Sequence, residues 1–308
     1  MTFEMIDQYP RFIPYELKKK STGFCNLIRY KNIPPTVLLS FTGGWIMNPS
    51  IKALMTSKQF IVSIATTLII MSTSMVINDI FDIEIDKVNN PLRPLVTGDI
   101  KKWEAIVFST SLLGLCEFLS MKYLPLYLQW IIHLSIFDIL IYTKFLKPML
   151  LIKNISCAAL ISFALCFSGF AATNIHNEKS LELLRIASRL VFFGSLHNEI
   201  LLDICDIKGD SENNIQTLPI ITTIPMAWNV VFVITQMNIL WAWFSLSRLY
   251  NYRVATVILF TTGPLLYRIM HIKDNNYSFL LTKLAVKNST APLGLTLIYL
   301  CILARKWL

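Results

Sequence analysis

The chain has 308 residues, of which 54% are hydrophobic and only 15% are charged. Soluble domains carry about 25% charged residues, so this composition excludes an ordinary soluble enzyme. The hydrophobic share corresponds to about 166 residues, enough for roughly eight or nine membrane-spanning helices of about 20 residues each. The net charge is +9, but the basic residues stand in short clusters between apolar runs. That pattern is typical of loops beside anionic lipid, and we expect no nucleic-acid partner.

Nine apolar runs follow one another along the chain and predict nine transmembrane helices. The runs are residues 33–49, 60–77, 104–121, 124–141, 154–172, 186–202, 219–247, 252–270 and 289–304. In the seventh run, Pro219 and Pro225 are expected to break or delay the helix. Residues 1–32 precede the first run as a basic, amphipathic segment. We expect residues 1–308 to form one all-α transmembrane domain.

The distribution of Lys and Arg predicts which ends of the helices face the cytoplasm. With nine crossings, 18 of the 28 basic residues lie on the side of the N-terminus, and the remaining 10 lie on the other side. Positively charged loops stay in the cytoplasm. We therefore expect the N-terminus and the loops after the even-numbered runs to be cytoplasmic.

Two acidic motifs with the same spacing stand at the ends of the second and sixth runs. They read NDIFDIEID and DICDIKGD. In each motif three aspartates occupy positions i, i+3 and i+7, which lie within about 60° of one helix face. The aspartates are Asp79, Asp82 and Asp86 in the first motif and Asp203, Asp206 and Asp210 in the second.

This duplication favours a metal site over two solvated helix ends. Carboxylates repel one another, and each costs ~2.5–3.5 kcal/mol at the bilayer centre and less at its edge. Bound cations make such a cluster tolerable. Ligands that are only carboxylate and amide oxygens select a hard ion, and Mg²⁺ keeps positions open for phosphate oxygens. The sequence therefore predicts six aspartate ligands for Mg²⁺ and a bound diphosphate.

Several other side chains are expected on the same side as the acidic motifs. The guanidinium of Arg93 matches the geometry of phosphate. Asp138 lies inside the fourth run, on the same face as Tyr142, and an acidic residue within a span is a functional candidate. We expect the diphosphate to be bound by Asn78, Arg93, Lys153 and Lys208, and we expect the catalytic residues to be Asp138, Tyr142 and Lys147.

The motifs together resemble those of the UbiA-type intramembrane prenyltransferase superfamily. The resemblance rests on N-D-x-x-D-x-x-x-D, N-x-P-x-R-P-x-x-x-G, Y-x-x-x-x-K and D-x-x-D-x-x-G-D with T-L-P beyond. It covers residues 25–304, approximately. The segment from Glu199 to Ile220 is most similar to the geranylgeranylglyceryl phosphate, homogentisate and chlorophyll synthase branches.

The resemblance implies a bundle of nine helices around a central cavity, with both acidic motifs at its cytoplasmic mouth. It implies that Asn78 joins the aspartates in holding Mg²⁺ and diphosphate, and that Arg93, Tyr142 and Lys147 surround the leaving group. The implied reaction moves a prenyl group from a prenyl diphosphate to an aromatic or polar-lipid acceptor. Asn198 and Leu202 stand where basic residues are common in the superfamily, a departure that bears on diphosphate binding or substrate choice.

Two other functions fit parts of the pattern. A terpene cyclase on the same scaffold would use an alkene of the substrate in place of an acceptor. A cation or substrate transporter would line its pathway with paired aspartates. Transport sites favour the midplane of the membrane, whereas these carboxylates stand at the ends of spans, so the prenyltransferase is the favoured interpretation.

Overall fold

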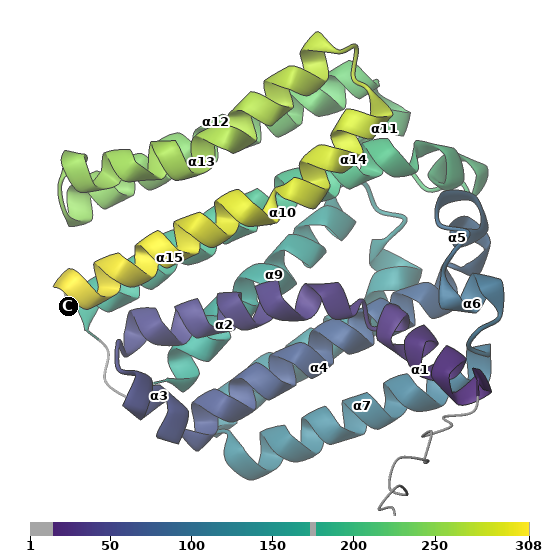
Figure 1. The fold of residues 1–308 in the computed structure, drawn as a ribbon, viewed down its shortest axis with the longest axis horizontal. Coiled ribbons are helices and arrows are strands. Elements are labelled where there is room, and N and C mark those ends of the chain that lie inside the picture. The colour runs from purple at the N-terminus through teal and green to yellow at the C-terminus, as the bar shows by residue number, and fades with distance from the viewer. Residues whose placement is uncertain (1–14, 173–176, 308) are drawn as a thin grey trace, which may run out of the picture.

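The computed structural model describes residues 15–172 and 177–307, which contain helices and no strand. The first fourteen residues of the predicted N-terminal segment lie outside this part of the chain. Figure 1 shows long helices lying roughly side by side, with short helices at their ends. The elements are α1 (Tyr15–Leu27), η1 (Tyr30–Asn32), α2 (Ile33–Met47), α3 (Ile51–Thr56), α4 (Lys58–Phe81), α5 (Ile83–Asn89), α6 (Pro94–Thr97), α7 (Lys102–Tyr123), α8 (Leu126–Ile141), η2 (Tyr142–Leu146), α9 (Ile152–Ala171), α10 (Glu178–Glu212), α11 (Leu218–Ile221), α12 (Ile224–Leu249), α13 (Tyr252–Asp274), α14 (Phe279–Asn288) and α15 (Thr290–Trp307).

The all-α prediction is confirmed for the described residues, and each of the nine predicted runs overlaps a helix. By length and hydropathy, 6 helical segments in the described ranges are long and apolar enough to cross a membrane. These candidates are Lys58–Phe81, Lys102–Tyr123, Ile152–Ala171, Ile224–Leu249, Tyr252–Asp274 and Phe279–Arg305. The helix α8 is apolar but shorter, and α10 carries many charges.

Helix α10 is much longer than the run of residues 186–202 that predicts it. It has 35 residues, and the second acidic motif lies within its last three turns. A search for apolar runs does not predict these last turns as helical, because one face of them carries the aspartates of the motif. The seventh run behaves as predicted at its start. Pro219 and Pro225 occupy the first turns of α11 and α12, where a missing amide hydrogen has no cost.

The first acidic motif departs from the predicted single helix. Helix α4 ends at Phe81 and α5 begins at Ile83, with Asp82 between them in a non-helical conformation. The amide of Asp82 still donates to Asn78 O (2.9 Å), and the amide of Asp86 donates to Asp82 O (2.7 Å). The chain therefore bends at Asp82 without losing these hydrogen bonds.

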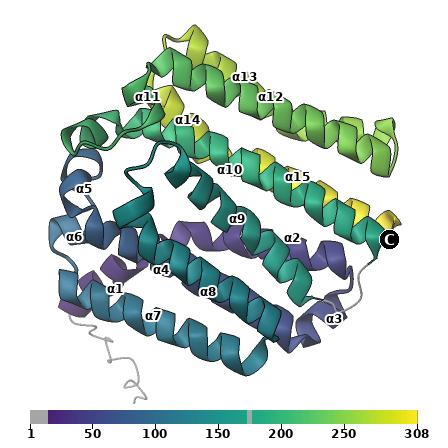
Figure 2. The same cartoon turned by 180° about the vertical axis from the view of Figure 1, so that it is seen from behind.

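Helix α9 runs through the middle of the molecule and packs against α2, α4, α8 and α10. On one side α10 packs against α12, which pairs with α13, and on the other side α4 packs against α7. Figure 2 shows the same order from behind. The short helices α5, α6 and α11 gather at one end of the long helices, whereas α3 lies at the other. The ends of α4 and α10 thus meet among the short helices.

Helices α2 and α9 approach closely at Gly43. A Cβ atom added to Gly43 would lie 2.0 Å from the backbone oxygen of Leu165, so only glycine permits this backbone separation. Gly114, in the middle of α7, has no atom within 4 Å of such a Cβ.

We predict that Gly43→Ala lowers the free energy of unfolding, because α2 and α9 must separate, at a cost of about 1–3 kcal/mol for overpacking. Gly114→Ala should leave stability unchanged or raise it by about 0.5–1 kcal/mol, since alanine favours helix. Thermal unfolding of both variants in the same detergent checks this pair. Equal melting temperatures would contradict the close contact.

Candidate active site

The carboxyl ends of α4 and α10 bring both acidic motifs together at the end of the molecule that holds the short helices. Of the six aspartates, five are at least 95% buried, and Asp206 is half-buried. Asn89 at the end of α5 ties the motifs to each other. Its amide nitrogen donates to Asp206 O (3.3 Å), and its amide oxygen accepts from the Gly209 amide (3.0 Å). A side chain at Gly209 would collide with Asn89, because a Cβ atom there would lie 2.5 Å from its amide.

The first motif is neutralised by two arginines and one lysine. Asp79 accepts from Arg29 (3.2 Å) and from Arg93, whose Nε also lies 3.5 Å from Asp86. The ammonium of Lys147, which follows η2, lies 2.5 Å from Asp82. Asp82 also accepts from the amide of Asn78 (2.7 Å).

The second motif is neutralised from helix α9. Lys153 Nζ lies 2.7 Å from Asp203 and 3.8 Å from Asp210. The neighbouring Asn154 donates to the other oxygen of Asp203 (3.0 Å). Both Lys153 and Asn154 are buried, so the first turn of α9 is fixed against α10.

Burial shifts the ionisation of the groups in the loops at this end. Desolvation raises the pKa of Asp86 to about 6, although the hydrogen bond from Asn90 opposes the shift. Desolvation and the neighbouring charge of Arg29 lower the pKa of Arg93 to about 9, which leaves Arg93 charged at neutral pH. Burial also lowers the pKa of Arg29, while the surrounding carboxylates oppose that shift.

Negative charge exceeds positive charge in this cluster. Six aspartates and Glu199 stand against Arg29, Arg93, Lys147 and Lys153. In the described ranges, no three Asp, Glu, His or Cys side chains converge as a ready-made metal cage. Instead, the carboxylate oxygens contact basic side chains. The donor set is nevertheless all oxygen with surplus negative charge, which suits a hard divalent cation.

The remaining predicted residues fall into two groups. Tyr142 and Asp138 lie beside the cluster: Tyr142 is near Cys157 and Asp203, and Asp138 accepts from Ser156 (2.7 Å). The side chain of Lys208 is exposed and has no ion pair with a described carboxylate. On α10, Lys208 is about 200° around the helix from Asp206 and from Asp210, so the structure does not bring it to the cluster.

Four residues of the cluster were not singled out from the sequence. Arg29 stands before the first run, where it counts only as one more basic residue, and Asn89 and Asn154 carry no charge pattern. Glu199 lies inside a predicted span. The only available signal is its spacing of i, i+4 to Asp203, which continues the face of the second motif.

Comparison with known proteins identifies the family. A model described as the UbiA prenyltransferase family matches residues 33–282. The chain belongs to the UbiA prenyltransferase family. Like the family, it is an integral multi-pass membrane protein. Its relatives include a digeranylgeranylglyceryl phosphate synthase of Haloquadratum walsbyi, 29% identical over 68% of this chain and 70% of that protein. The corresponding synthase of Methanocaldococcus jannaschii is 36% identical over 47% of this chain and 49% of that protein.

Solved structures share the UbiA fold over almost the whole chain. A structure from a study of digeranylgeranylglyceryl phosphate synthase in membranes has a TM-score of 0.67 at 22% identity, covering 94% of this chain and 99% of that one. A UbiA homologue from Archaeoglobus fulgidus, bound to GPP and Mg²⁺, has a TM-score of 0.66 at 15% identity, covering 90% and 99%. At these identities the comparison establishes the fold.

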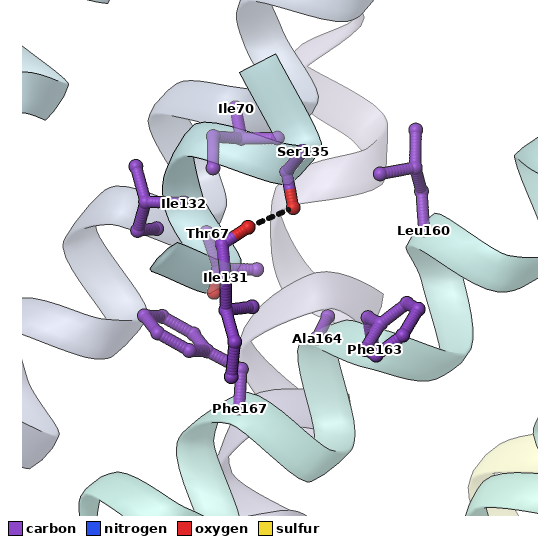
Figure 3. A pocket seen from close by; sticks show the side chains of 9 residues that line it. All are labelled: Thr67, Ile70, Ile131, Ile132, Ser135, Leu160, Phe163, Ala164 and Phe167. Atoms are coloured by element: carbon purple, nitrogen blue, oxygen red, sulfur yellow. Dashed lines mark hydrogen bonds between the residues drawn. The ribbon is translucent and has the colours of Figure 1, made fainter. Parts of the chain in front are cut away.

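An apolar cavity of this UbiA-family protein lies deeper in the helices than the acidic cluster. Figure 3 shows that α4, α8 and α9 line it, with Phe163 and Phe167 among its side chains. The hydroxyl of Ser135 is turned to the carbonyl of Ile131 (2.9 Å). Thr67 in the lining is 12 residues before Asp79 on α4, or about 18 Å along the helix. The cavity therefore lies beside the membrane-spanning part of α4, below the charged groups.

Proposed function

We propose that this protein transfers a prenyl group from a prenyl diphosphate to the hydroxyl group of a polar-lipid acceptor and releases diphosphate. One observation carries the proposal: two acidic motifs, cross-tied at one end of the helices, stand above an apolar cavity. A prenyl diphosphate has the same division, with an anionic head and an apolar tail. The family and its synthase relatives support this chemistry. The whole chain would serve as one catalytic domain.

The surplus of carboxylates points to Mg²⁺ held by Asp79, Asp82, Asp86, Asp203, Asp206 and Asp210. The bound ion would neutralise charge on the departing diphosphate. The basic side chains then have a second task. Arg93, Lys147 and Lys153 contact carboxylates in this structure, and they are free to turn to phosphate oxygens once cations hold those carboxylates. Asn78 and Tyr142 would line the same head-group site.

The acceptor class follows from the relatives. A digeranylgeranylglyceryl phosphate carries two geranylgeranyl groups on one glyceryl phosphate, so a singly prenylated glyceryl phosphate with a free hydroxyl is the natural acceptor of those synthases. We infer an acceptor of this class here. An aromatic acceptor is the alternative that the assay must distinguish.

The deciding experiment supplies purified protein in lipid with labelled C10, C15 or C20 diphosphate and Mg²⁺. Parallel samples contain a prenylglyceryl phosphate, a phenolic acceptor or no acceptor. A prenylated glyceryl phosphate supports the proposal, and a prenylated phenol reassigns the acceptor. A hydrocarbon formed without acceptor would make the protein a cyclase, and no release of diphosphate would refute the proposal.

The first prediction concerns the metal ligands. Asp79→Asn and Asp203→Asn should each lower kcat/KM by roughly 10²–10³, the usual loss on removing one group that stabilises developing charge, and EDTA should abolish turnover. Asp274→Asn, at the exposed end of α13, should keep wild-type kinetics. Steady-state assays with each variant check this, and full turnover in EDTA would contradict it.

The second prediction concerns Arg93. Arg93→Ala should weaken prenyl diphosphate binding and slow transfer by about 1.5–3 kcal/mol, the worth of a hydrogen bond to a charged group. Arg93→Lys should recover part of the loss, because an ammonium lacks the bidentate fork. The KM for the acceptor should hardly change. Arg185 is exposed at the other end of α10, so the control Arg185→Ala should keep wild-type binding and transfer rates. A change confined to acceptor KM would assign Arg93 to the acceptor.

We further propose nine membrane crossings, by α2, α4, α7, α8, α9, α10, α12, α13 and the pair α14 and α15, with the N-terminus and the acidic end in the cytoplasm. The excess of basic residues on that side supports this orientation.

Single cysteines replacing the exposed Lys18 and Lys101 should react with an impermeant thiol reagent from the cytoplasmic side only. Cysteines replacing Lys122 and Lys179 should react from the other side. Labelling of Lys18 and Lys101 positions from opposite sides would overturn the topology.

A further inference from the structure

Glu199 extends the acidic face of α10 one turn deeper into the membrane. It precedes Asp203 by four residues, so the two side chains lie on the same face, about 6 Å apart along the helix axis. At this depth Glu199 is within electrostatic reach of Arg29, Lys153, Tyr142 and Asp203. It therefore belongs to the wall of the site without belonging to either acidic motif.

The partners of Glu199 differ from those of the neighbouring carboxylates. Asp79, Asp82 and Asp203 each contact a basic side chain within 3.2 Å. Glu199 is half-buried and has no hydrogen bond or ion pair with any residue in the described ranges. A carboxylate in a membrane protein interior without a partner is costly, and such a residue marks a functional position.

The depth of Glu199 matches the place where the new bond must form. The diphosphate is drawn to the acidic motifs and the tail to the apolar cavity, so the reacting carbon C1 lies between them. Glu199 stands one turn below Asp203 in that interval. An acceptor oxygen that attacks C1 has to approach at the same level.

We propose that Glu199 accepts the proton of the acceptor hydroxyl, an inference that rests on the proposed transfer reaction. As the C1–O bond to diphosphate breaks, its electron pair leaves with the diphosphate. The acceptor oxygen forms the new bond to C1, and its proton passes to the Glu199 carboxylate. In this step the nucleophile is a hydroxyl oxygen, which is the group that the glyceryl phosphate acceptor proposed above would present.

Two other candidates fit this role less well. Tyr142 carries a phenol, which is protonated at neutral pH and therefore is a poor proton acceptor. Asp138 accepts a hydrogen bond from Ser156 at 2.7 Å and lies on α8, outside the acidic face of α10. Glu199 lies on that face, and neither of its oxygens is engaged by a residue in the described ranges.

The test compares Glu199→Gln, Glu199→Ala and the control Glu182→Gln, whose residue lies on the same helix in an exposed pair with Arg185. Glu199→Gln keeps the shape and removes the proton acceptor. We expect its transfer rate to fall by roughly 10²–10⁴, the usual contribution of general base catalysis. Mg²⁺-dependent binding of labelled prenyl diphosphate should stay within twofold of wild type. Added formate should restore part of the transfer rate of Glu199→Ala, and Glu182→Gln should match wild type.

The outcomes separate this inference from the proposed function. If wild-type protein forms no prenylated acceptor, the proposed function fails. If wild type is active and Glu199→Gln transfers within threefold of it, the role of Glu199 as proton acceptor is wrong. Loss of prenyl diphosphate binding in Glu199→Gln would also overturn it, because Glu199 would then serve the head-group site.

Discussion

Charge balance at one end of an apolar bundle is the constraint on which this structure depends. Buried carboxylates are tolerable only if cations approach them, and here the cations come from separate parts of the chain. Arg29 precedes α2, Arg93 follows α5, Lys147 follows η2 and Lys153 begins α9. The electrostatic requirement of one site thereby fixes the positions of four connecting segments.

The same pairs join the short helices and loops of the acidic end to the long helices. Asn89 joins α5 to α10, and Lys153 joins α9 to α10. Arg29 and Arg93 share Asp79 as a partner, so the effects of substituting these two arginines will not add. The apolar helices need only close contacts such as that of Gly43 with the backbone of α9. Specific polar contacts gather where the diphosphate head group would bind, whereas the apolar cavity is lined mainly by hydrophobic side chains.

Sequence alone predicted much of this arrangement. Hydrophobic runs located the helices because burial in lipid demands long apolar segments, and the repeated i, i+3, i+7 spacing located the acidic end. Periodicity did not predict the bend at Asp82 or the full length of α10, since both depend on contacts between distant segments. Asn89 and Asn154 are neutral amides whose roles come only from their partners. Lys208 was predicted from proximity in sequence, but it lies on the other side of α10.

Arg29 illustrates how two demands meet at one position. Its backbone is left-handed, with φ of 51° and ψ of 59°, a conformation that costs a non-glycine residue about 1–2 kcal/mol. Glycine or asparagine would relieve the backbone and leave Asp79 with one cation fewer. No residue type satisfies both requirements. Residues that favour the left-handed backbone lack the positive charge, and residues with the positive charge are strained in that backbone conformation. Substitutions chosen to stabilise this enzyme should therefore be made at positions other than Arg29.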